Sequence, residues 1–471
     1  MVGPTIFPWV SDLYGRERLK LKNSHGGKVD PVLLLQQQPP DEPSVTTAAP
    51  PTSQLISCNR SHHRYDICSL NGPTTMDPTK STFYLLDPIT TTNSLSSISS
   101  STNIPQKIRP YPRKWETNLM TSHIKELTTT LLTSSSSSSS PNSDHIHCQI
   151  QHNAPALVFS SGGYTGNLYH DFDDGFIPLF VTLRSIFPNR QNSQLRPILV
   201  ISKCNNWWLS KYSQLLKLFT PYPIINLDKE TATHCFPYTT IGLISHGYMT
   251  INSTLLPNSE TLRDFRVLLE TAYAKISSPI IPSSTDSTWL STRPRLVLVG
   301  RTGDHVGRVM VNQAEVVLLA NEVGFDVTIF EPTPLTSMSE AYGLMNRSHA
   351  MVGVHGAAMT HLLFLRPGSV FIQVVPIGTD WPAETCYGMP AKEIGLEYME
   401  YKIKVKESSL VEKYGMDNLV LSNPREVTKG DWSNTKNIYL KEQNVRVDLV
   451  RFGKYLRKAF KKAKKFMDKE G

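Results

Sequence analysis

The chain has 471 residues, enough for two or three domains, and 39% of them are hydrophobic. The net charge is +8, but the basic residues gather near the C-terminus instead of spreading over a domain among aromatic residues, which argues against a nucleic-acid-binding protein. None of the six cysteines forms a CxxC pair and no apolar run reaches 18 residues, so we expect neither a zinc site nor a transmembrane helix.

The first third of the chain is poor in apolar residues. Residues 1–54 are rich in Pro, Gln and Thr and read as a disordered stem or linker. Two Ser/Thr-rich tracts, 88–103 and 128–143, are predicted to be loops inserted into a domain, because strand-like pieces flank both. The N-terminus also lacks a signal-peptide apolar region, so either the protein has no membrane anchor or the gene model lacks its first exon.

Two features point to the secretory pathway. Cys58 and Cys68 lie ten residues apart in a polar loop and are able to form a disulfide in an oxidising compartment; the alternative is two unrelated thiols. Sequons begin at Asn59, Asn252 and Asn346 and would accept N-glycans, although such tripeptides also occur by chance.

From residue 155 onward, buried strands alternate with helices. Strands are predicted at 155–160, 196–202 and 223–228, and helices at 176–187, 207–219 and 260–273. Strands that are apolar on both faces and alternate with helices indicate a parallel sheet covered on both sides. We therefore assign residues 55–285 to a first Rossmann-like domain.

The alternation stops at a Pro/Ser-rich linker, 280–294, and then restarts. The second series has strands at 295–301, 326–332, 350–354, 369–375 and near 403, and helices at 312–325, 336–348, 356–365 and near 391. Asn312 is the expected N-cap of the first helix, with Glu315 close to a capping box. Residues 286–440 form a second doubly wound domain in this interpretation, and the cleft between the two domains is the expected site.

A basic helix is predicted over 441–471. Its apolar positions Leu449, Phe452, Leu456 and Phe460 have helical spacing. This pattern favours a helix that packs on the body of the protein with its Lys face in solvent. The alternative is a helix that binds a membrane surface or nucleic acid.

One turn of the second domain has the character of an anion site. His355, Gly356, Ala357 and Ala358 join a buried strand to a helix, whose N-terminal N–H groups would suit a diphosphate. The alternative is a small-residue turn that serves only helix–strand packing. Arg301, at the end of a neighbouring strand, and Arg308, in the following loop, are candidate phosphate ligands, although a solvated surface charge is the plainer interpretation of each.

An acidic cluster opens the first long helix of the first domain. His170, Asp171, Asp173 and Asp174 follow a Gly-rich turn. Carboxylates at a helix N-terminus favour its dipole, yet four titratable groups in five positions exceed what capping needs. We therefore expect one member of this cluster to act as a general base that faces the cleft.

These segments together resemble glycosyltransferase family 61, especially its plant clade of xylan arabinosyl- and xylosyltransferases. The resemblance covers about residues 55–460 and includes "CNRSHHRYDICSLNG", "KIRPYPRKW", "FSSGGYTGNLYHDFDDGFIPLF" and "VGVHGAAMTHLLFLRPGSVFIQVVP". It implies a GT-B fold, an inverting mechanism and a nucleotide-sugar donor, which we take to be a UDP-sugar. Because no DxD motif follows a strand of the second domain, we expect the leaving diphosphate to be stabilised without a bound metal. It also implies a Golgi type II membrane protein with a stem, although no anchor is visible in this sequence.

The resemblance also divides the roles of the site residues. The UDP-pentose donor would bind the second domain through Arg301, Arg308 and the turn from His355 to Thr360. Glu384 would reach the ribose or only start a helix, and Trp381 and Tyr387 would stack on a sugar or base or only pack. The xylan or glycan acceptor and the base would lie near 170–174.

Other functions remain open at this stage. One is a non-catalytic glycan-binding protein on a decayed transferase fold. The intact charged motifs argue against this alternative. Another is a β-1,2-xylosyltransferase that acts on N-glycans. The sequence does not choose the donor sugar, the linkage or the oligomeric state.

Overall fold

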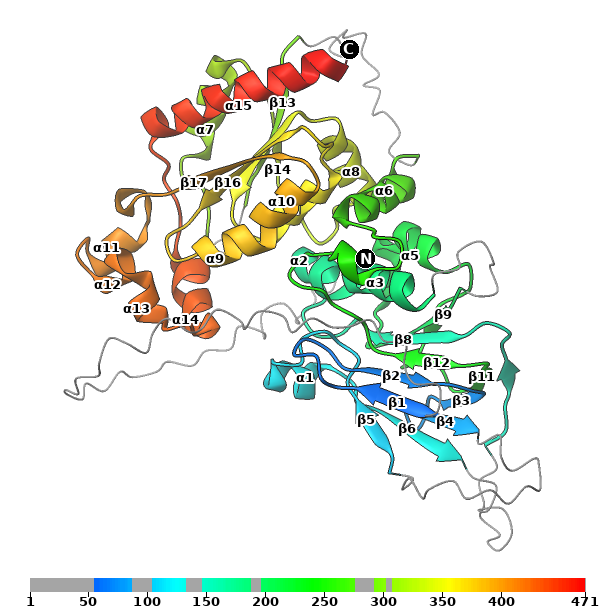
Figure 1. Cartoon of the computed structure of the whole chain (residues 1–471). Helices are drawn as coiled ribbons and strands as arrows, with labels where there is room; N and C mark the ends of the chain where they lie inside the picture. Colours follow the sequence, from blue (N-terminus) through cyan, green and yellow to red (C-terminus); the bar gives the residue numbers. More distant parts are fainter. Residues whose placement is uncertain are drawn as a thin grey trace, which may run out of the picture. The chain divides into compact units, whose positions relative to one another are not determined.

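The computed structural model describes residues 55–86, 104–132, 146–187, 196–275, 292–301 and 307–470, all within one compact unit, Thr52–Gly471 (Figure 1). The predicted stem, the first Ser-rich tract, 133–143 of the second and 280–291 of the linker lie outside these residues. Residues 128–132, which we expected to be part of a loop, belong instead to a strand in which Thr129 is fully buried.

The N-terminal half contains a six-stranded mixed sheet in the order β1-β2-β12-β8-β9-β10. Its strands are β1 (Ile56–Asn59), β2 (Ile67–Leu70), β8 (Ala156–Ser160), β9 (Ile198–Ser202), β10 (Ile225–Asn226) and β12 (Thr239–Ile241). Strands β12, β8, β9 and β10 are parallel, whereas β1 and β2 pair antiparallel. Every residue of β8 and β9 is buried, as their apolar sequences predict.

A second six-stranded sheet covers one face of the first. Its order is β5-β6-β4-β3-β11-β7, with strands β3 (Thr74–Asp77), β4 (Thr82–Leu86), β5 (Gln106–Ile108), β6 (Leu127–Leu132), β7 (Ile150–Gln151) and β11 (His234–Phe236). Val158 and Val200 of the first sheet share one apolar core with Met76, Phe83 and Leu85 of the second.

Helices cover only the other face of the first sheet, where Leu157, Phe159, Leu199 and Ile201 point. They are α2 (Leu168–His170), the π-helical turn η5 (Asp171–Phe176), α3 (Ile177–Ile186), α4 (Asn206–Lys211), α5 (Ser213–Phe219) and α6 (Leu262–Tyr273); α1 (Thr117–His123) and η7 (Ser253–Leu255) complete this half. This half therefore differs from the expected parallel sheet with helices on both faces. An apolar strand shows that both faces are buried, but not whether a helix or a second sheet buries them.

The C-terminal half has a five-stranded, fully parallel sheet in the order β14-β13-β15-β16-β17. The strands are β13 (Arg295–Val299), β14 (Asp326–Phe330), β15 (Ala350–Val354), β16 (Val370–Val375) and β17 (Glu397–Lys402). Numbered along the chain the order is 2-1-3-4-5, a doubly wound arrangement whose direction reverses between β13 and β15. In such sheets ligands bind beyond the carboxyl ends of the strands at the reversal.

Both faces of this sheet are covered by helices. Alternate residues of β13 and β15 belong to different cores, Leu296 and Val352 to one and Val297 and Met351 to the other. The helices of this half are α7 (Gln313–Val323), α8 (Met338–Asn346), η9 (Ala357–Phe364), α9 (Asp380–Ala383), η10 (Glu384–Gly388), α10 (Met389–Glu393), η11 (Val405–Glu407), α11 (Leu410–Tyr414), α12 (Leu419–Ser422), α13 (Pro424–Thr428), α14 (Trp432–Thr435), η12 (Lys436–Glu442) and α15 (Leu449–Glu470).

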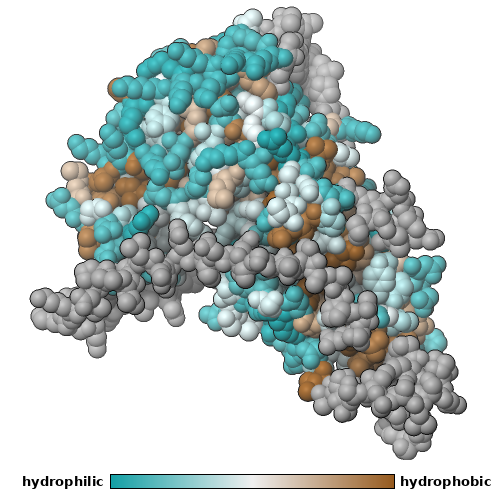
Figure 2. Space-filling view, in the orientation of Figure 1, coloured by the Kyte–Doolittle hydropathy of each residue, from teal (hydrophilic) through white to brown (hydrophobic). Residues whose placement is uncertain are grey.

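The basic C-terminal helix α15 packs on the body of the protein, as its spacing predicts. Phe452 and Leu456 are fully buried in the same core as β13 and β15, and Phe460 is packed against that core. Figure 2 shows hydrophilic residues over its outward face. The capping prediction for α7 is wrong in its detail: Asn312 stands at the N-cap position, but its side chain exchanges two hydrogen bonds with the backbone of Val447 instead of capping the helix.

The two halves share a continuous apolar core. Phe172 and Phe265 of the N-terminal half lie in one cluster with Tyr342 and Phe364 of the C-terminal half. The Phe172 and Phe364 rings are 6.5 Å apart and nearly perpendicular. This contact between the Phe172 and Phe364 side chains holds η5 and η9 against each other.

Disulfides join Cys58 to Cys68 and Cys148 to Cys235. The first confirms the pairing that the spacing suggested, because the two cysteines are directly opposite in the antiparallel pair β1–β2. The second was not predicted.

Within the described part of the chain, no helix combines the length and the apolar character that a membrane crossing requires.

Candidate active site

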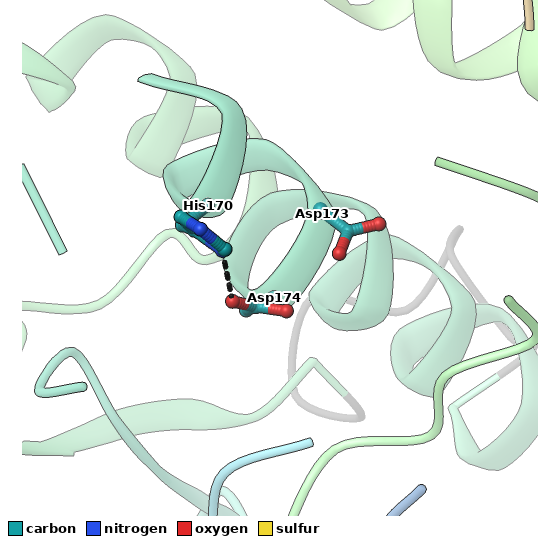
Figure 3. Close-up of side chains that lie close together, drawn as sticks. All are labelled: His170, Asp173 and Asp174. Carbon is teal, nitrogen blue, oxygen red and sulfur yellow. Dashed lines mark hydrogen bonds and ion pairs between the residues drawn. The ribbon is translucent and has the colours of Figure 1, made fainter. Parts of the chain in front are cut away.

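The Gly-rich turn after β8 leads into a helix that gathers three of the four predicted acid–base residues. Asn167 caps the helix by accepting a hydrogen bond from the Tyr169 amide at 3.1 Å. The helix then widens into the π-helical η5, and ligand atoms of His170, Asp173 and Asp174 all lie within 4.8 Å of one another (Figure 3). Of these side chains His170 is the most exposed, at 18%.

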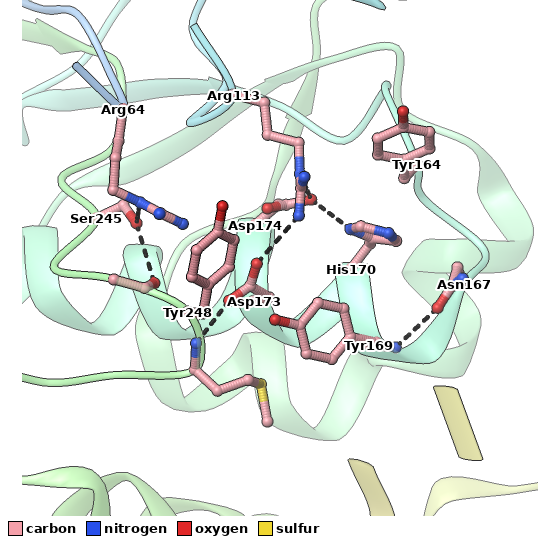
Figure 4. Close-up of polar contacts among 12 residues, drawn as sticks. Arg64, Arg113, Tyr164, Asn167, Tyr169, His170, Asp173, Asp174, Ser245 and Tyr248 are labelled. Atoms are coloured by element: carbon pink, nitrogen blue, oxygen red, sulfur yellow. Dashed lines mark hydrogen bonds and ion pairs between the residues drawn. The ribbon is translucent and has the colours of Figure 1, made fainter. Parts of the chain in front are cut away.

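Arg113 lies against both carboxylates of this cluster (Figure 4). Its Nε donates to Asp174 at 2.7 Å and its Nη2 to Asp173 at 3.2 Å. Tyr111 donates a further hydrogen bond to Asp174 at 2.9 Å. The guanidinium therefore places one positive charge beside two buried carboxylates.

Burial and Arg113 separate the two carboxylates in acidity. Burial raises the pKa of Asp173 to about 7, and the neighbouring charge of Asp174 adds to the rise. Burial also opposes ionisation of Asp174, but the charges and hydrogen bonds of Arg113 and His170 prevail and lower its pKa well below the usual value. Asp174 is therefore the fixed anion of the cluster.

His170 and Asp174 form a dyad. Nδ1 of His170 lies 2.8 Å from Oδ2 of Asp174, and because a carboxylate only accepts, Nδ1 carries the proton and Nε2 keeps its lone pair. Burial lowers the pKa of His170 despite the opposing effect of Asp174. The imidazole is thus neutral near pH 7 and has the tautomer of a general base.

Asp171, the fourth predicted residue, lies apart from the other three. Its carboxylate accepts hydrogen bonds from Tyr212 at 2.7 Å, from Trp208 at 3.2 Å and from the Gly166 amide at 3.2 Å. Burial raises its pKa to about 6. These contacts tie the turn to Trp208 of α4 and to Tyr212, the residue at which the predicted helix 207–219 is divided into α4 and α5.

The donor-side residues meet at the carboxyl ends of β13 and β15, where the strand order reverses. A Cβ placed on Gly356 would collide with Nη2 of Arg301 and lie 3.0 Å from Nη1 of Arg308, so both guanidinium groups border this glycine. Arg308 is itself held by the backbone of η12, since its Nε donates to Leu440 at 2.8 Å. The structure therefore brings Arg301, Arg308 and the turn together.

His355 is buried beneath this turn. Gln373 donates from Nε2 to His355 Nδ1 at 2.9 Å and accepts from Tyr398 at 2.8 Å, so the His355 proton lies on Nε2. Burial, together with the charges of Arg308 and Arg301, lowers the His355 pKa to about 3. His355 is therefore a neutral hydrogen-bond donor at physiological pH.

The remaining predicted donor residues have diverse surroundings. Ala357 and Ala358 begin the 3₁₀ helix η9 and pack partly on the central core, and Thr360 in the same helix is buried. Glu384 forms an ion pair with Lys392 at 2.7 Å. Tyr387 is buried and lies 5.3 Å from the His355 ring, so it packs instead of standing open for stacking.

Aromatic rings connect the two groups of residues. Tyr387 is 5.3 Å from His355 on one side and 5.7 Å from Tyr169 on the other, and Tyr169 lies 5.3 Å from His170. The base cluster and the donor turn are thus joined by a short chain of contacts. By contrast, a groove of about 1080 Å³ lies elsewhere, at the carboxyl ends of β16 and β17, and contains none of the predicted residues.

Sequence reasoning missed Arg64 and Arg113. Both stand in the segments "SHHRYDIC" and "YPRKW" that carried the family resemblance, but neither segment has a strand–turn–helix pattern that points to a site. Arg64 is 5% exposed, and its Nε donates to Ser245 at 3.2 Å. The sequence signal that was available for both residues is an arginine surrounded by aromatic residues.

The chain is similar to known glycosyltransferases. The family model described as "Glycosyltransferase 61" matches residues 168–372, from α2 into β16. The chain is 40% identical over 418 residues to the xylan glycosyltransferase MUCI21 of Arabidopsis thaliana, covering 87% of this chain and 80% of the relative. It is 34% identical over 416 residues to the beta-1,2-xylosyltransferase XYXT1 of Oryza sativa subsp. japonica (86% and 83% covered). It is also 32% identical over 396 residues to the alpha-1,3-arabinosyltransferase XAT3 of the same organism (84% and 63% covered).

Proposed function

Because the chain belongs to glycosyltransferase family 61, we propose that it transfers a pentose, xylose or arabinofuranose, from a UDP-sugar to a xylan-type polysaccharide. The observation that carries the proposal is its 40% identity over 418 residues to a xylan glycosyltransferase. The relatives differ in the sugar they are named for, which leaves both pentoses as donors.

The donor diphosphate binds at the switch point of the C-terminal sheet, in the manner of a GT-B enzyme. Arg301 and Arg308 border Gly356 there, and η9 begins at the next residue, Ala357, so its N-terminal end lies at the same place. His355 donates from Nε2 to a phosphate oxygen. The two guanidinium groups take up the charge that develops on the leaving UDP, so transfer proceeds without a bound metal.

His170 is the general base in this proposal. Its Nε2 takes the proton from an acceptor hydroxyl while that oxygen attacks the anomeric carbon from the face opposite UDP, which inverts the centre. Asp174 holds the tautomer and stabilises the imidazolium that forms, and Arg113 keeps Asp174 ionised. Asp173, whose pKa is about 7, is held by the Arg113 guanidinium and is not the base in this proposal.

A donor screen tests the function. Purified protein is incubated with UDP-xylose or UDP-arabinofuranose and a xylo-oligosaccharide, and the linkage of the product is determined. Transfer of one pentose is expected. Transfer only to an N-glycan core would support the β-1,2-xylosyltransferase of N-glycans instead, and oligosaccharide binding without turnover of any UDP-sugar would indicate a non-catalytic glycan-binding protein.

We also propose that the enzyme works in the Golgi lumen, attached through a membrane anchor. The two disulfides support an oxidising compartment. Of the three sequon asparagines, Asn59 is exposed, whereas Asn252 and Asn346 are half-buried and Asn346 accepts a hydrogen bond from Arg266. Asn59 is therefore the foremost glycan site, and glycosidase treatment of secreted protein, compared with an Asn59→Gln variant, tests it.

A further inference from the structure

Three aromatic side chains form a surface beside the base cluster. The Tyr248 ring lies between Trp115, at 6.4 Å, and Trp381, at 5.5 Å, and meets both edge to face. Trp115 is 40% and Trp381 57% exposed. We call these three residues the aromatic platform. Single exposed rings are common on protein surfaces, but a cluster of rings such as this one is typical of a ligand-binding surface.

The platform combines distant segments of both halves. Trp115 precedes α1, Tyr248 lies between β12 and η7, and Trp381 belongs to α9. No single helix or sheet requires these three rings to meet. Their position is therefore better explained by a ligand that contacts both halves than by the packing of one element.

Arg64 lies under the platform. The carbon at the centre of its guanidinium is 4.2 Å from the centre of the Tyr248 ring and 4.9 Å from that of Trp115. Its Nη2 is buried and, among the described residues, has no hydrogen-bond acceptor. A buried N–H without an acceptor costs free energy, so this group is available to donate to an oxygen that a ligand supplies.

The platform also adjoins the proposed base. Arg113, which binds Asp173 and Asp174, lies 5.4 Å from the Trp115 ring. The amide of Met249, next to Tyr248, donates to Asp173 at 2.6 Å (Figure 4). A molecule on the platform is consequently close to the acid–base cluster, whereas the donor residues Arg301 and Arg308 border Gly356.

We propose that the aromatic platform and Arg64 form the acceptor subsite, which binds the neutral chain of a xylan-type polysaccharide. The apolar C–H faces of the pentose rings stack on Trp115 and Trp381, and Nη2 of Arg64 donates to a sugar oxygen. This inference rests on the proposed function, because it assigns the acceptor of that same reaction. The UDP-sugar donor binds separately, at the switch point of the C-terminal sheet.

The test compares Trp381→Ala and Trp115→Ala with Trp207→Ala. Trp207 is 43% exposed and lies beside Gly166, away from Tyr248, so it is a matched control. Binding of xylohexaose and of UDP is measured by calorimetry, and the KM for each substrate is measured by transfer. We expect xylohexaose affinity to fall about tenfold in each platform variant, with UDP affinity and the melting temperature unchanged. Arg64→Lys, which keeps the charge but loses Nη2, should likewise raise the acceptor KM.

The outcomes separate this inference from the proposed function. Unchanged xylohexaose affinity in both platform variants would overturn the acceptor subsite, and so would a loss of UDP affinity instead. If the parent bound an N-glycan core but not xylohexaose, the proposed polysaccharide acceptor would be wrong. In that case, weaker binding of the N-glycan core by Trp381→Ala would still support the aromatic platform as the acceptor subsite. Unchanged binding would overturn it.

Discussion

Removing the imidazole of His170 is the most direct test of the mechanism. The His170→Ala variant loses the only group of the proposed dyad that is able to accept a proton on Nε2. General-base catalysis typically contributes about 10²–10⁴-fold, which corresponds to about 2.7–5.5 kcal/mol of transition-state stabilisation. We therefore expect kcat/KM for pentosyl transfer to fall by this factor. The UDP affinity should not change, because His170 makes none of the contacts around Gly356.

The pH profile identifies the base independently. Transfer requires neutral His170, so activity should decline as the pH falls through the pKa of this residue. Burial lowers that pKa, which places the acid limb of kcat/KM below pH 6.5. A limb at about pH 7 would instead match Asp173.

The assay measures initial rates with a UDP-pentose and xylo-oligosaccharide from pH 4.5 to 8. Asp174→Asn is the second variant: its amide donates to Nδ1, which moves the proton to Nε2 and removes the lone pair. Its melting temperature must be measured too, because Asp174 is a buried partner of Arg113. A His170→Ala variant within tenfold of the parent would refute the assignment.

Three further predictions concern other parts of the molecule. Gly356→Ala should weaken UDP binding at least tenfold in calorimetry, because the added Cβ displaces the guanidinium groups of Arg301 and Arg308, whereas Gly453→Ala in α15, with nothing closer than 3.5 Å, should leave it unchanged. Transfer should continue in excess EDTA, because Arg113 already neutralises the carboxylates; a loss that Mn²⁺ restores would contradict the metal-free mechanism. Leu456→Ala should lower the free energy of unfolding by about 2–5 kcal/mol in urea denaturation, and a value under 1 kcal/mol would show that α15 is not part of the core.

The sequence predicted the C-terminal half well because its signals are local. Five parallel strands alternate with helices, and each appears within a few residues of its expected place. The same locality allowed Arg301 to be placed correctly, since a residue that follows a parallel strand must lie at the carboxyl edge of the sheet.

The N-terminal half was predicted less well because its second sheet depends on distant pairings. Strand β3 pairs with β11, some 160 residues later in the chain, and β4 pairs with β6 across a Ser-rich tract. Short strands of two to six residues give almost no periodicity, and nothing in a local window specifies such partners. Arg113, which follows β5 of this sheet, was missed for this reason. Arg64 lies in the loop between β1 and β2, and no pattern in that loop points to a site.

The shared core between the halves bears on catalysis. An inverting transfer requires the base and the leaving diphosphate on opposite sides of one carbon, and small displacements of the reacting groups reduce the rate strongly. In this protein Phe172, between Asp171 and Asp173, packs on Phe364 at the end of η9, whose first residues form the donor turn. The distance from His170 to that turn is therefore set by aromatic packing within one core. A substitution such as Phe364→Leu should accordingly reduce kcat more than it raises either KM, because Phe364 is buried in that core. A change confined to KM would show that the two helices are positioned by some other contact.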